Sequence, residues 1–214
     1  MTLAQAEDTA EEQKSQDHHA LLSAIDACQA GVQRVHLLDH KQDDALLQEL
    51  FTRDGAGIMI SALAFENTRI AQIDDISGIL ELIQPLEDKG ILVKRSREDI
   101  EIHINSFVVM ERDGAVLACA ALHAYDESQV GELACLAVDE HYSGFGRGEQ
   151  LLTAIEHQAR KHKLTALYVL TTQTAHWFLE QGFVPADVSD LPVEKQTLYN
   201  YQRNAKIFKK SLPN

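Results

Sequence analysis

Long apolar runs, paired cysteines and positive charge are all scarce in this 214-residue chain, and each scarcity excludes a class of protein. The apolar runs are short, and the chain does not open with the charged, hydrophobic and small-residue order of a secretory signal. We therefore expect neither a membrane span nor a leader peptide. The three cysteines, Cys28, Cys119 and Cys135, form no CxxC pair and leave one unpaired. That usage is typical of a reducing compartment, so we predict a cytoplasmic protein.

Charge and histidine usage argue against nucleic acid, anionic membranes and metal ions as partners. Lysine and arginine total 19 against 33 aspartates and glutamates, which gives a net charge of −14, and such a protein repels polyanions. None of the ten histidines has the spacing to carboxylates or cysteines that defines a zinc site, so we predict no metal. An acidic protein that binds a small anion must gather its positive groups locally. Residues 94–97 and 203–210 are such basic clusters, although most short charge runs are solvated helix ends.

Patterning along the chain predicts an α+β protein preceded by a smaller segment. The first 19 residues are polar and acidic, which predicts a mobile arm. From residue 67 the order is β-α-α-β-β-β-α-β-α-β-β, which suits a mixed, mostly antiparallel sheet flanked by helices. We expect helices over 20–30, 43–52 and 174–181, one ended by Gly90, one begun at Ser96 and one after Gly148. We expect strands over 32–38, 56–61, 67–71, 107–112, 115–124, 130–138, 166–171, 183–185 and 199–208.

The segment from Ser143 to Glu149 says more about function than any other part of the chain. Gly144, Gly146 and Gly148 follow an apolar strand pattern and precede an amphipathic helix pattern. Glycines let consecutive backbone N–H groups point at one oxygen cluster, and a helix N-terminus adds partial positive charge, so the segment predicts a diphosphate site. Glu149 stands where a nucleotide-hydrolase loop needs lysine, and the G-x-G-x-G spacing is not a dinucleotide fingerprint. A turn that contains glycine only for conformational reasons is the alternative.

This segment resembles the acyl-CoA-binding motif of the GNAT superfamily of N-acetyltransferases, which reads Arg/Gln-x-x-Gly-x-Gly/Ala between a strand and a helix. Ser143 replaces the arginine or glutamine, which removes one side-chain contact to phosphate and keeps the backbone cradle. Ordered blocks across residues 67–213 are also similar to bacterial N-acetylglutamate synthase, among them 78–83, 90–93, 131–135, 169–172 and 199–203. Residues 21–61 resemble the last piece of the amino-acid-kinase-like domain that precedes the transferase domain in that family. The resemblance divides the chain into a mobile acidic arm (1–19), a remnant of the kinase-like domain (20–62) and a GNAT acetyltransferase domain (67–214).

The resemblance implies a reaction and a set of site residues. The reaction is transfer of the acetyl group of acetyl-CoA to the amine of L-glutamate by direct attack, which gives N-acetyl-L-glutamate as the first step of arginine biosynthesis. The residues expected at acetyl-CoA are Cys135, Leu136, Val138, Ser143, Gly144, Phe145, Gly146, Arg147, Gly148 and Glu149. Those expected at the glutamate, whose carboxylates suit arginine forks, are Val93, Arg95, Lys195 and Arg203. Ala205 stands where the family usually has a serine two residues after the matching arginine.

Acetyl transfer to an amino acid needs a base, because the amine is mostly protonated at neutral pH and an ammonium cannot attack a thioester. Glu132 is our candidate, since a carboxylate within an apolar strand is costly to bury unless it is paired. An exposed strand residue is the alternative. Glu132 and Cys135 are three residues apart, so both reach one cleft only if the strand is bulged or splayed between them. Cys135 has no local partner that would activate its thiol, so we interpret it as a contact residue rather than a nucleophile.

The acid beside the departing thiolate is less well marked in the sequence. The family often uses a tyrosine in the helix after the fifth strand, and residues 174–179 contain none. Thr171 matches a hydroxyl position proposed for this role in the synthase. His176 is an alternative, although an isolated histidine in an amphipathic helix is usually structural.

Two other functions stay open on the sequence. One is a GNAT acetyltransferase with another amine acceptor, and the other is a CoA-binding regulatory module without turnover. Most of the kinase-like domain, which holds the arginine site in the family, is missing, so we predict that this chain alone does not respond to arginine. The partner that replaces that domain is then a second copy of the chain or a larger polypeptide.

Overall fold

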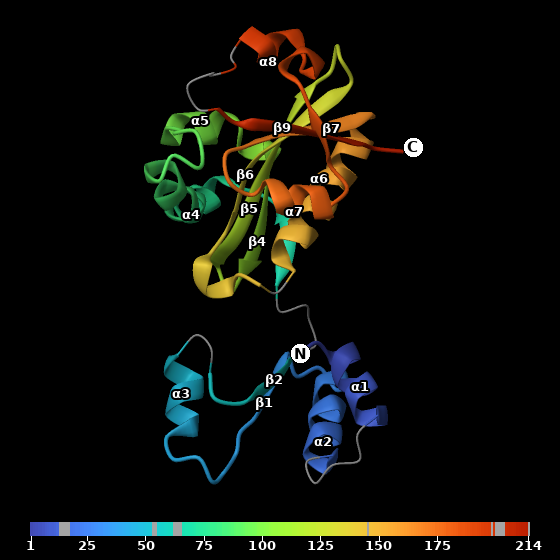
Figure 1. Ribbon diagram of the computed structural model, residues 1–214. Coiled ribbons are helices and arrows are strands. Elements are labelled where there is room, and N and C mark those ends of the chain that lie inside the picture. Colours follow the sequence, from blue (N-terminus) through green and yellow to red (C-terminus); the bar gives the residue numbers. More distant parts are fainter. Residues whose placement is uncertain are drawn as a thin grey trace. The chain divides into compact units, whose positions relative to one another are not determined.

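The computed structural model describes residues 1–12, 18–52, 55–61, 66–144, 146–197, 199 and 204–213 (Figure 1). The chain divides into two compact units, Met1–Glu66 and Asn67–Asn214. Each unit has an apolar core of its own, which is the usual mark of a separate domain.

The first unit packs helices against a two-stranded antiparallel sheet. Its elements are α1 (Leu3–Glu12), α2 (His18–Gln29), β1 (Arg34–Leu37), α3 (Ala45–Phe51) and β2 (Ile58–Ser61). Leu3–Glu12, within the segment predicted as a mobile arm, is helical. Ala6 and Ala10 lie four residues apart on one face of α1 and are buried against α2 and Ile60. These alanines thus form the buried face of an otherwise acidic helix. A pattern of two small residues is a weak indication of an amphipathic helix.

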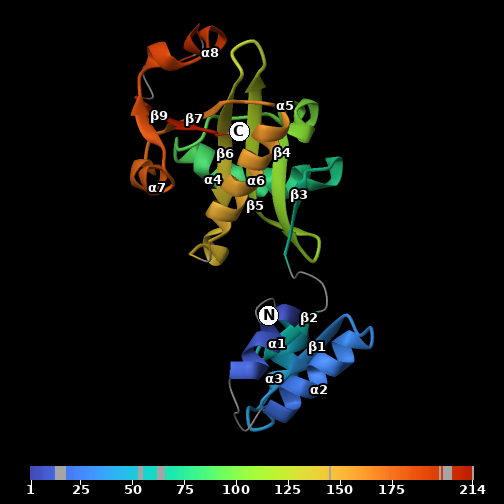
Figure 2. The same cartoon turned by 90° about the vertical axis from the view of Figure 1, so that its right-hand side faces the viewer.

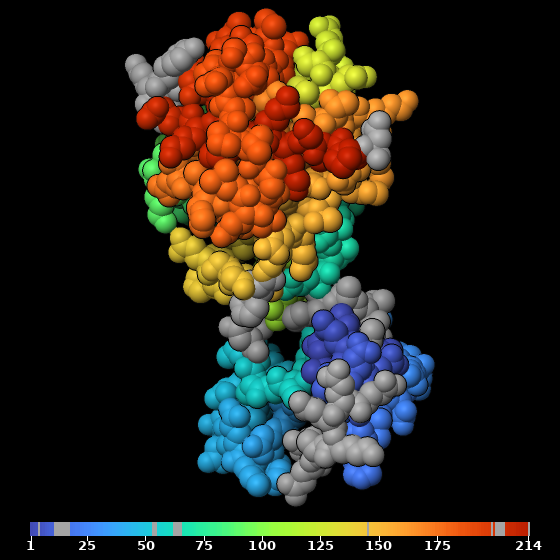
Figure 3. Space-filling model, turned by 45° about the vertical axis from the view of Figure 1, so that its right-hand side comes forward, coloured from blue at the N-terminus to red at the C-terminus, as the bar shows by residue number. Residues whose placement is uncertain are grey.

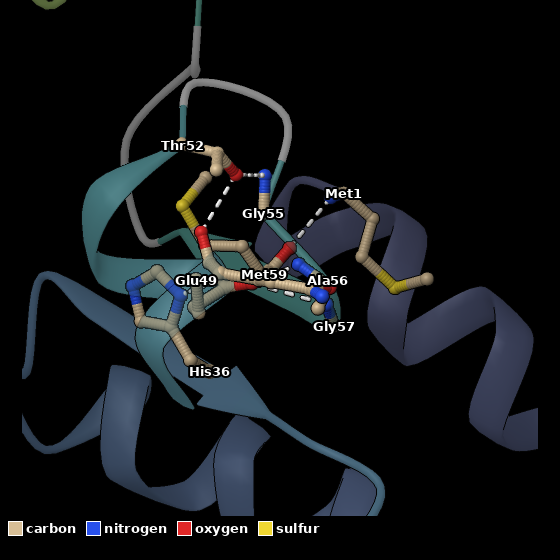
Figure 4. A network of polar contacts seen from close by, with 9 residues as sticks. Met1, His36, Glu49, Thr52, Gly55, Ala56, Gly57 and Met59 are labelled. Carbon is tan, nitrogen blue, oxygen red and sulfur yellow. Dashed lines mark hydrogen bonds and ion pairs between the residues drawn. The ribbon is translucent and has the colours of Figure 1, made fainter. Parts of the chain in front are cut away.

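Glu49 ties α3 to the residues just before β2 (Figure 4). One of its carboxylate oxygens is ion-paired with Nδ1 of His36. The other accepts hydrogen bonds from the backbone N–H groups of Ala56 and Gly57, at 2.7 and 3.0 Å. These contacts, with His36 first, hold the pKa of Glu49 below its ordinary value.

The second unit is built on a seven-stranded sheet in the order β3-β4-β5-β6-β7-β9-β8. Neighbouring strands are antiparallel except β6 and β7, which are parallel. The strands are β3 (Asn67–Ile70), β4 (Phe107–Arg112), β5 (Ala115–Tyr125), β6 (Val130–Val138), β7 (Ala166–Thr171), β8 (Val184–Ala186) and β9 (Lys206–Ser211). The helices are α4 (Ile76–Asp88), α5 (Arg97–Ile102), α6 (Arg147–Lys161), α7 (Ala175–Glu180) and α8 (Val193–Thr197). The mixed, mostly antiparallel sheet flanked by helices is confirmed.

Alternation along β5 sorts the core of this unit into two layers. Ala118, Ala120 and Leu122 belong to the layer that α6 covers, whereas Cys119 and Ala121 belong to the layer that α4 covers. Successive side chains of a strand point to opposite faces, and small residues let a helix lie close to the sheet. Figure 2 shows α6 crossing the front of the central strands.

The C-terminal part departs from the predicted boundaries. The last strand in the described residues is Lys206–Ser211, whereas residues 200–203 of the predicted strand 199–208 lie outside the described residues, and the short helix α8 was not predicted. Lysines at positions 209 and 210 suggest a polar tail, but they are accommodated within the strand. Lys209 Nζ lies 5.3 Å from the centre of the Tyr168 ring, and Lys210 Nζ is 2.6 Å from Glu156. In Figure 3 the segments coloured orange to red, which include α7 and β9, form much of the visible surface of this unit.

Candidate functional site

Strand β6 contains the bulge that the spacing of Glu132 and Cys135 demands. Ala134 pairs with Ala121 of β5, but the next pair joins Ala137 to Cys119, so two residues of β6 lie opposite one of β5. Cys135 has a φ of 51°, in the left-handed region that branched side chains avoid. A bulge of this kind turns a residue to the other face and increases the local twist.

The bulge brings Glu132 and Cys135 to the same face of the sheet. Glu132 pairs with His123, which lies two residues from Ala121 along β5. The side chains of Glu132, His123 and Ala121 therefore lie on the same face of the sheet. Cys135 packs in the core layer that contains Ala121 and Cys119. The predicted bulge is thus confirmed, and its geometric consequence follows.

Beyond the bulge, β6 and β7 separate and a cleft opens between them. The last β6–β7 pair in the described part of the chain joins Leu133 to Val169, although β7 continues to pair with β9 as far as Thr171. The cleft has a volume of about 590 Å³. Its walls come from β6, β7, the N-terminus of α6, helix α7 and the chain after α4.

Most of the residues predicted to bind the cosubstrate line this cleft. They are Cys135, Leu136, Val138, Ser143, Gly144, Gly146, Arg147, Gly148 and Glu149. Phe145 lies outside the described residues. The cleft also has an apolar lining that was not predicted, formed by Leu86, Ile91, Leu92 and Trp177, because these residues come from separate elements that only packing brings together.

The glycine-rich segment presents backbone N–H groups to the cleft. Gly146 precedes α6 with a φ of 71°, and Gly144 has a φ of 84°, values that strain any residue with a Cβ. The first intrahelical bond of α6 runs from the N–H of Gln150 to the carbonyl of Gly146, at 3.0 Å. The N–H groups of the preceding first turn have no such partner, and they carry the positive end of the helix dipole. This is the geometry of an anion site.

Two contacts hold this segment in place. A Cβ at Gly148 would lie 3.2 Å from Cζ2 of Trp177, so the absence of a side chain lets α6 approach α7. The Arg147 guanidinium donates through Nη1 to the carbonyl of Tyr142 at 2.6 Å and lies 5.5 Å from the centre of its ring. Arg147 therefore contributes to the structure of the loop through its side chain, and it also lines the cleft.

Glu132 is buried and paired, so the alternative of an exposed strand residue is wrong. Its relative exposure is 8%. Its Oε2 atom accepts a hydrogen bond from the Tyr125 hydroxyl at 3.1 Å and lies 2.7 Å from Nζ of Lys195. Burial of a carboxylate is tolerated when donors and a counter-charge replace water. Lys195, predicted at a glutamate carboxylate, is bound to Glu132 here.

Arg95 and His123 extend this group of polar residues. Arg95 Nη2 lies 3.4 Å from Nε2 of His123, and its backbone N–H donates to Oε1 of the buried Glu87 at 2.9 Å. Burial, the largest cause, lowers the pKa of His123, and Arg95 acts in the same direction. A neutral imidazole beside a guanidinium can accept its hydrogen bond. We call Glu132, Arg95, His123, Tyr125 and Lys195 the polar cluster.

Cys135 connects the polar cluster to the cleft. Burial raises the pKa of its thiol to about 11, with Arg95 opposing the shift and Glu87 and Glu132 adding to it. Cys135 thus lies within electrostatic reach of the polar cluster while it also lines the cleft. Its thiol is protonated at neutral pH, and a protonated thiol is a poor nucleophile. The interpretation of Cys135 as a contact residue agrees with this environment.

The comparisons with known proteins agree with this architecture. A sequence profile of the Acetyltransferase (GNAT) family matches residues 76–183, a range that contains the cleft walls from α4 to α7. The chain belongs to the GNAT acetyltransferase family. The GNAT fold expected from the glycine segment is confirmed.

Two relatives share more than the GNAT fold with this chain. An amino-acid acetyltransferase of Pseudomonas putida is 54% identical over 190 residues, which is 89% of this chain and 44% of the relative. One of Serratia proteamaculans is 53% identical over 196 residues, with the same two coverages. The chain therefore spans less than half the length of these relatives.

Solved structures of N-acetylglutamate synthase from Neisseria gonorrhoeae are also similar. The form complexed with coenzyme A and L-arginine is 40% identical with a TM-score of 0.88, and it covers 100% of this chain and 49% of the other. The form complexed with coenzyme A and N-acetyl-glutamate has a TM-score of 0.69 and the same identity, and covers 100% of this chain and 51% of the other. The resemblance to N-acetylglutamate synthase is confirmed.

Thr171 and His176 of the GNAT domain lie in different surroundings. Thr171 is buried, lines the cleft and has its Oγ1 atom 3.0 Å from Oγ1 of Thr174. The His176 side chain is 88% exposed and pairs with Glu180 at 3.1 Å, and it does not line the cleft. Of the two candidates for an acid beside the thiolate, Thr171 alone is in position.

The other predicted site residues do not line the cleft in the described part of the chain, and of these Glu132, Arg95 and Lys195 belong to the polar cluster. Val93 is 53% exposed, and Arg203 lies outside the described residues. His123 and Tyr125 of the GNAT domain were missed. The turn after β5 could have predicted them, because it fixes the register of β5 and β6. Tyr125 pairs with Val130, and two residues further from the turn His123 pairs with Glu132.

The described residues contain neither a candidate metal site nor a helix suited to span a membrane. No group of three or more histidine, cysteine, aspartate or glutamate side chains has an arrangement that could hold a metal ion. Within the same residues, no helix has the length and apolar character needed to cross a membrane.

Proposed function

We propose that this chain transfers the acetyl group of acetyl-CoA to the amine of L-glutamate, giving N-acetyl-L-glutamate in arginine biosynthesis. One observation carries the proposal: the β6 bulge joins a cleft with an anion-binding end to a buried cluster that contains a carboxylate and a guanidinium. The similarity to amino-acid acetyltransferases, and to a synthase solved with coenzyme A and N-acetyl-glutamate, supports this choice of substrates.

The cleft suits a long thioester carrier. The diphosphate binds the backbone N–H groups of the glycine-rich segment at the start of α6, where the positive end of the helix dipole lies. The pantetheine arm follows the separated part of β6 past Val138 and Leu136, so that the thioester reaches Cys135. Backbone groups at a bulge are released from the ladder, and one of them is suited to hold the acetyl carbonyl.

The residues of the polar cluster have distinct roles in this reaction. Glu132 takes a proton from the acceptor ammonium, directly or through water, and the amine nitrogen then attacks the acetyl carbon. The new N–C bond forms, the attacking nitrogen loses its second proton to water, and the C–S bond breaks. The thiolate takes a proton from the Thr171 hydroxyl, which is reprotonated from solvent, or from solvent directly. Arg95 pairs with an acceptor carboxylate, and Val93, Lys195 and Arg203 stay predicted contacts of the same substrate.

A thiol-release assay with L-glutamate and a panel of other amino acids and amines tests the proposal. We expect L-glutamate to be preferred, because an ammonium and carboxylates on one small molecule match Glu132 and Arg95. Equal turnover of other amines would identify an acetyltransferase with a different acceptor. Binding of acetyl-CoA without turnover of any acceptor would identify a regulatory module. Addition of arginine to the assay checks the predicted insensitivity of this chain.

A further inference from the structure

The two carboxylate oxygens of Glu132 have unequal surroundings. Oε2 accepts the Tyr125 O–H at 3.1 Å and is 2.7 Å from the Lys195 ammonium. Within the described residues, Oε1 has no hydrogen-bond or ion-pair partner. Two donors on one oxygen fix the rotation of the carboxylate, and no described residue occupies the second oxygen.

Sheet register explains how Tyr125 reaches Glu132. Tyr125 pairs with Val130, two residues before Glu132 on β6, so it is the diagonal neighbour of Glu132 on the same face. Aromatic side chains span such diagonal distances between antiparallel strands. His123 occupies the directly opposite position. The contact is therefore part of a paired β-hairpin and does not depend on a loop.

Tyr125 and Lys195 contribute different properties to this contact. Burial first, and then the charge of Glu132, raise the pKa of Tyr125, so its O–H stays a donor over the working pH range. Lys195 supplies a positive charge from α8, a helix of five residues, on a long flexible stem. The rigid phenol sets the direction of the carboxylate, whereas the ammonium compensates its charge.

We propose that Tyr125 is a positioning residue, which together with Lys195 holds Oε2 of Glu132 so that Oε1 receives the proton of the acceptor amine. This inference rests on the proposed acetyl transfer. It adds a residue outside the glycine segment and the predicted substrate contacts. Tyr125 does not touch the substrate in this scheme, and its effect passes through the orientation of Glu132.

Steady-state kinetics of Tyr125→Phe give the first test. We expect kcat to fall about 10-fold to 100-fold, the value of one hydrogen bond to a charged group, with both KM values changed less than about twofold. The acid limb of the pH–rate profile should move to higher pH, because the lost donor favoured the charged carboxylate. Other charged groups that face the pair, namely Lys195, Arg95 and Glu194, remain in the variant. An unchanged kcat and profile would overturn the proposal.

Tyr168→Phe is the matched control. Tyr168 is buried and pairs with Glu132 from the other side, on β7, but the structure shows no hydrogen bond between its hydroxyl and that carboxylate in the described residues. We expect its kcat to stay within about twofold of the parent chain. An equal loss in both variants would show that tyrosine removal acts through general packing, and it would also overturn the proposal.

A measurement without turnover separates this inference from the proposed function. Urea unfolding of Tyr125→Phe, Glu132→Gln and the double variant forms a thermodynamic cycle. We expect a coupling of about fivefold or more in the unfolding equilibrium constant, and additivity in the cycle that uses Tyr168→Phe. If no acceptor is acetylated, the proposed function fails while this coupling still reports the contact. Additive effects of Tyr125→Phe and Glu132→Gln would refute the contact itself.

Discussion

At the α6 end of the cleft the site is formed by backbone, whereas the polar cluster, which adjoins the cleft at Cys135, is formed by charged side chains. The α6 end depends on conformation: Gly144 and Gly146 have positive φ values, and helix geometry leaves N–H groups unpaired. The polar cluster depends on residue identity, since Glu132 and Arg95 each need a specific partner. Ser143 shows the difference, because replacement of a family arginine or glutamine leaves the backbone cradle intact.

The largest effect should come from Glu132→Gln, in the polar cluster. An amide keeps the shape of the carboxylate and cannot take a proton, so we expect kcat to fall about 10²-fold to 10⁴-fold. Acetyl-CoA binding, measured by calorimetry, should be unchanged because its diphosphate contacts lie at the α6 end. Glu111→Gln is the control, a strand carboxylate that pairs with Arg69 at 3.8 Å and belongs neither to the cleft wall nor to the polar cluster. Retention of more than roughly a tenth of the activity would remove Glu132 from the role of base.

Arg95→Ala should act on one substrate only. We expect the KM for L-glutamate to rise about 10-fold to 100-fold, since a charge-assisted bond to a carboxylate is lost. The KM for acetyl-CoA should change little. Arg97→Ala is the matched control, because Arg97 lies in the same basic segment and is exposed. A parallel rise in both KM values would mean that Arg95 supports the fold of the cleft rather than the acceptor.

Gly146→Ala tests the backbone end. A Cβ at a φ of 71° strains the start of α6 by about 1–2 kcal/mol, and we expect weaker acetyl-CoA binding with little change in the KM for glutamate. Gly114→Ala is the control, since Gly114 has a φ of 79° and open space around its Cβ position, in the β4–β5 turn. Comparable loss of stability in both variants, with weaker binding only in Gly146→Ala, is the expected pattern. Undiminished binding would place the diphosphate elsewhere.

The smallest effect concerns pH and His123. Burial keeps the pKa of His123 below its ordinary value of 6.5, so under acid conditions the unfolded chain binds a proton that the folded chain does not. Stability is therefore lost as the pH falls below 6.5, down to the lowered folded pKa. In His123→Gln this loss should be shallower by up to about 1.4 kcal/mol per pH unit. Urea unfolding on both sides of pH 6.5 measures it.

His141→Gln is the control for this pH effect. The His141 side chain is 90% exposed, so its replacement should leave the pH dependence of unfolding close to that of the parent chain. An identical slope in His123→Gln and in the parent would show that the buried imidazole does not contribute.

Local signals in the sequence were sufficient for most of the second unit. The hairpin around Asp113 and Gly114, strand β6 and the start of α6 all lie where alternation, turn residues and glycine spacing predict them. The count of residues between Glu132 and Cys135 made a bulged or splayed strand the condition for both to share one face, and the structure has the bulge. Helices α1 and α8 were not foreseen, because both are short and their pattern is mainly polar. In such segments tertiary contacts override propensity.

The amino-acid order alone determined the anion-binding turn and the candidate base, since both depend on neighbours within one strand–turn–helix segment. Only the tertiary structure decided how that base is held. Tyr125 comes from the strand before β6 and Lys195 from a helix far along the chain, and Arg95 follows α4. Strand register and helix docking bring these residues together, and neither produces a periodic sequence pattern at Tyr125, Lys195 or Arg95.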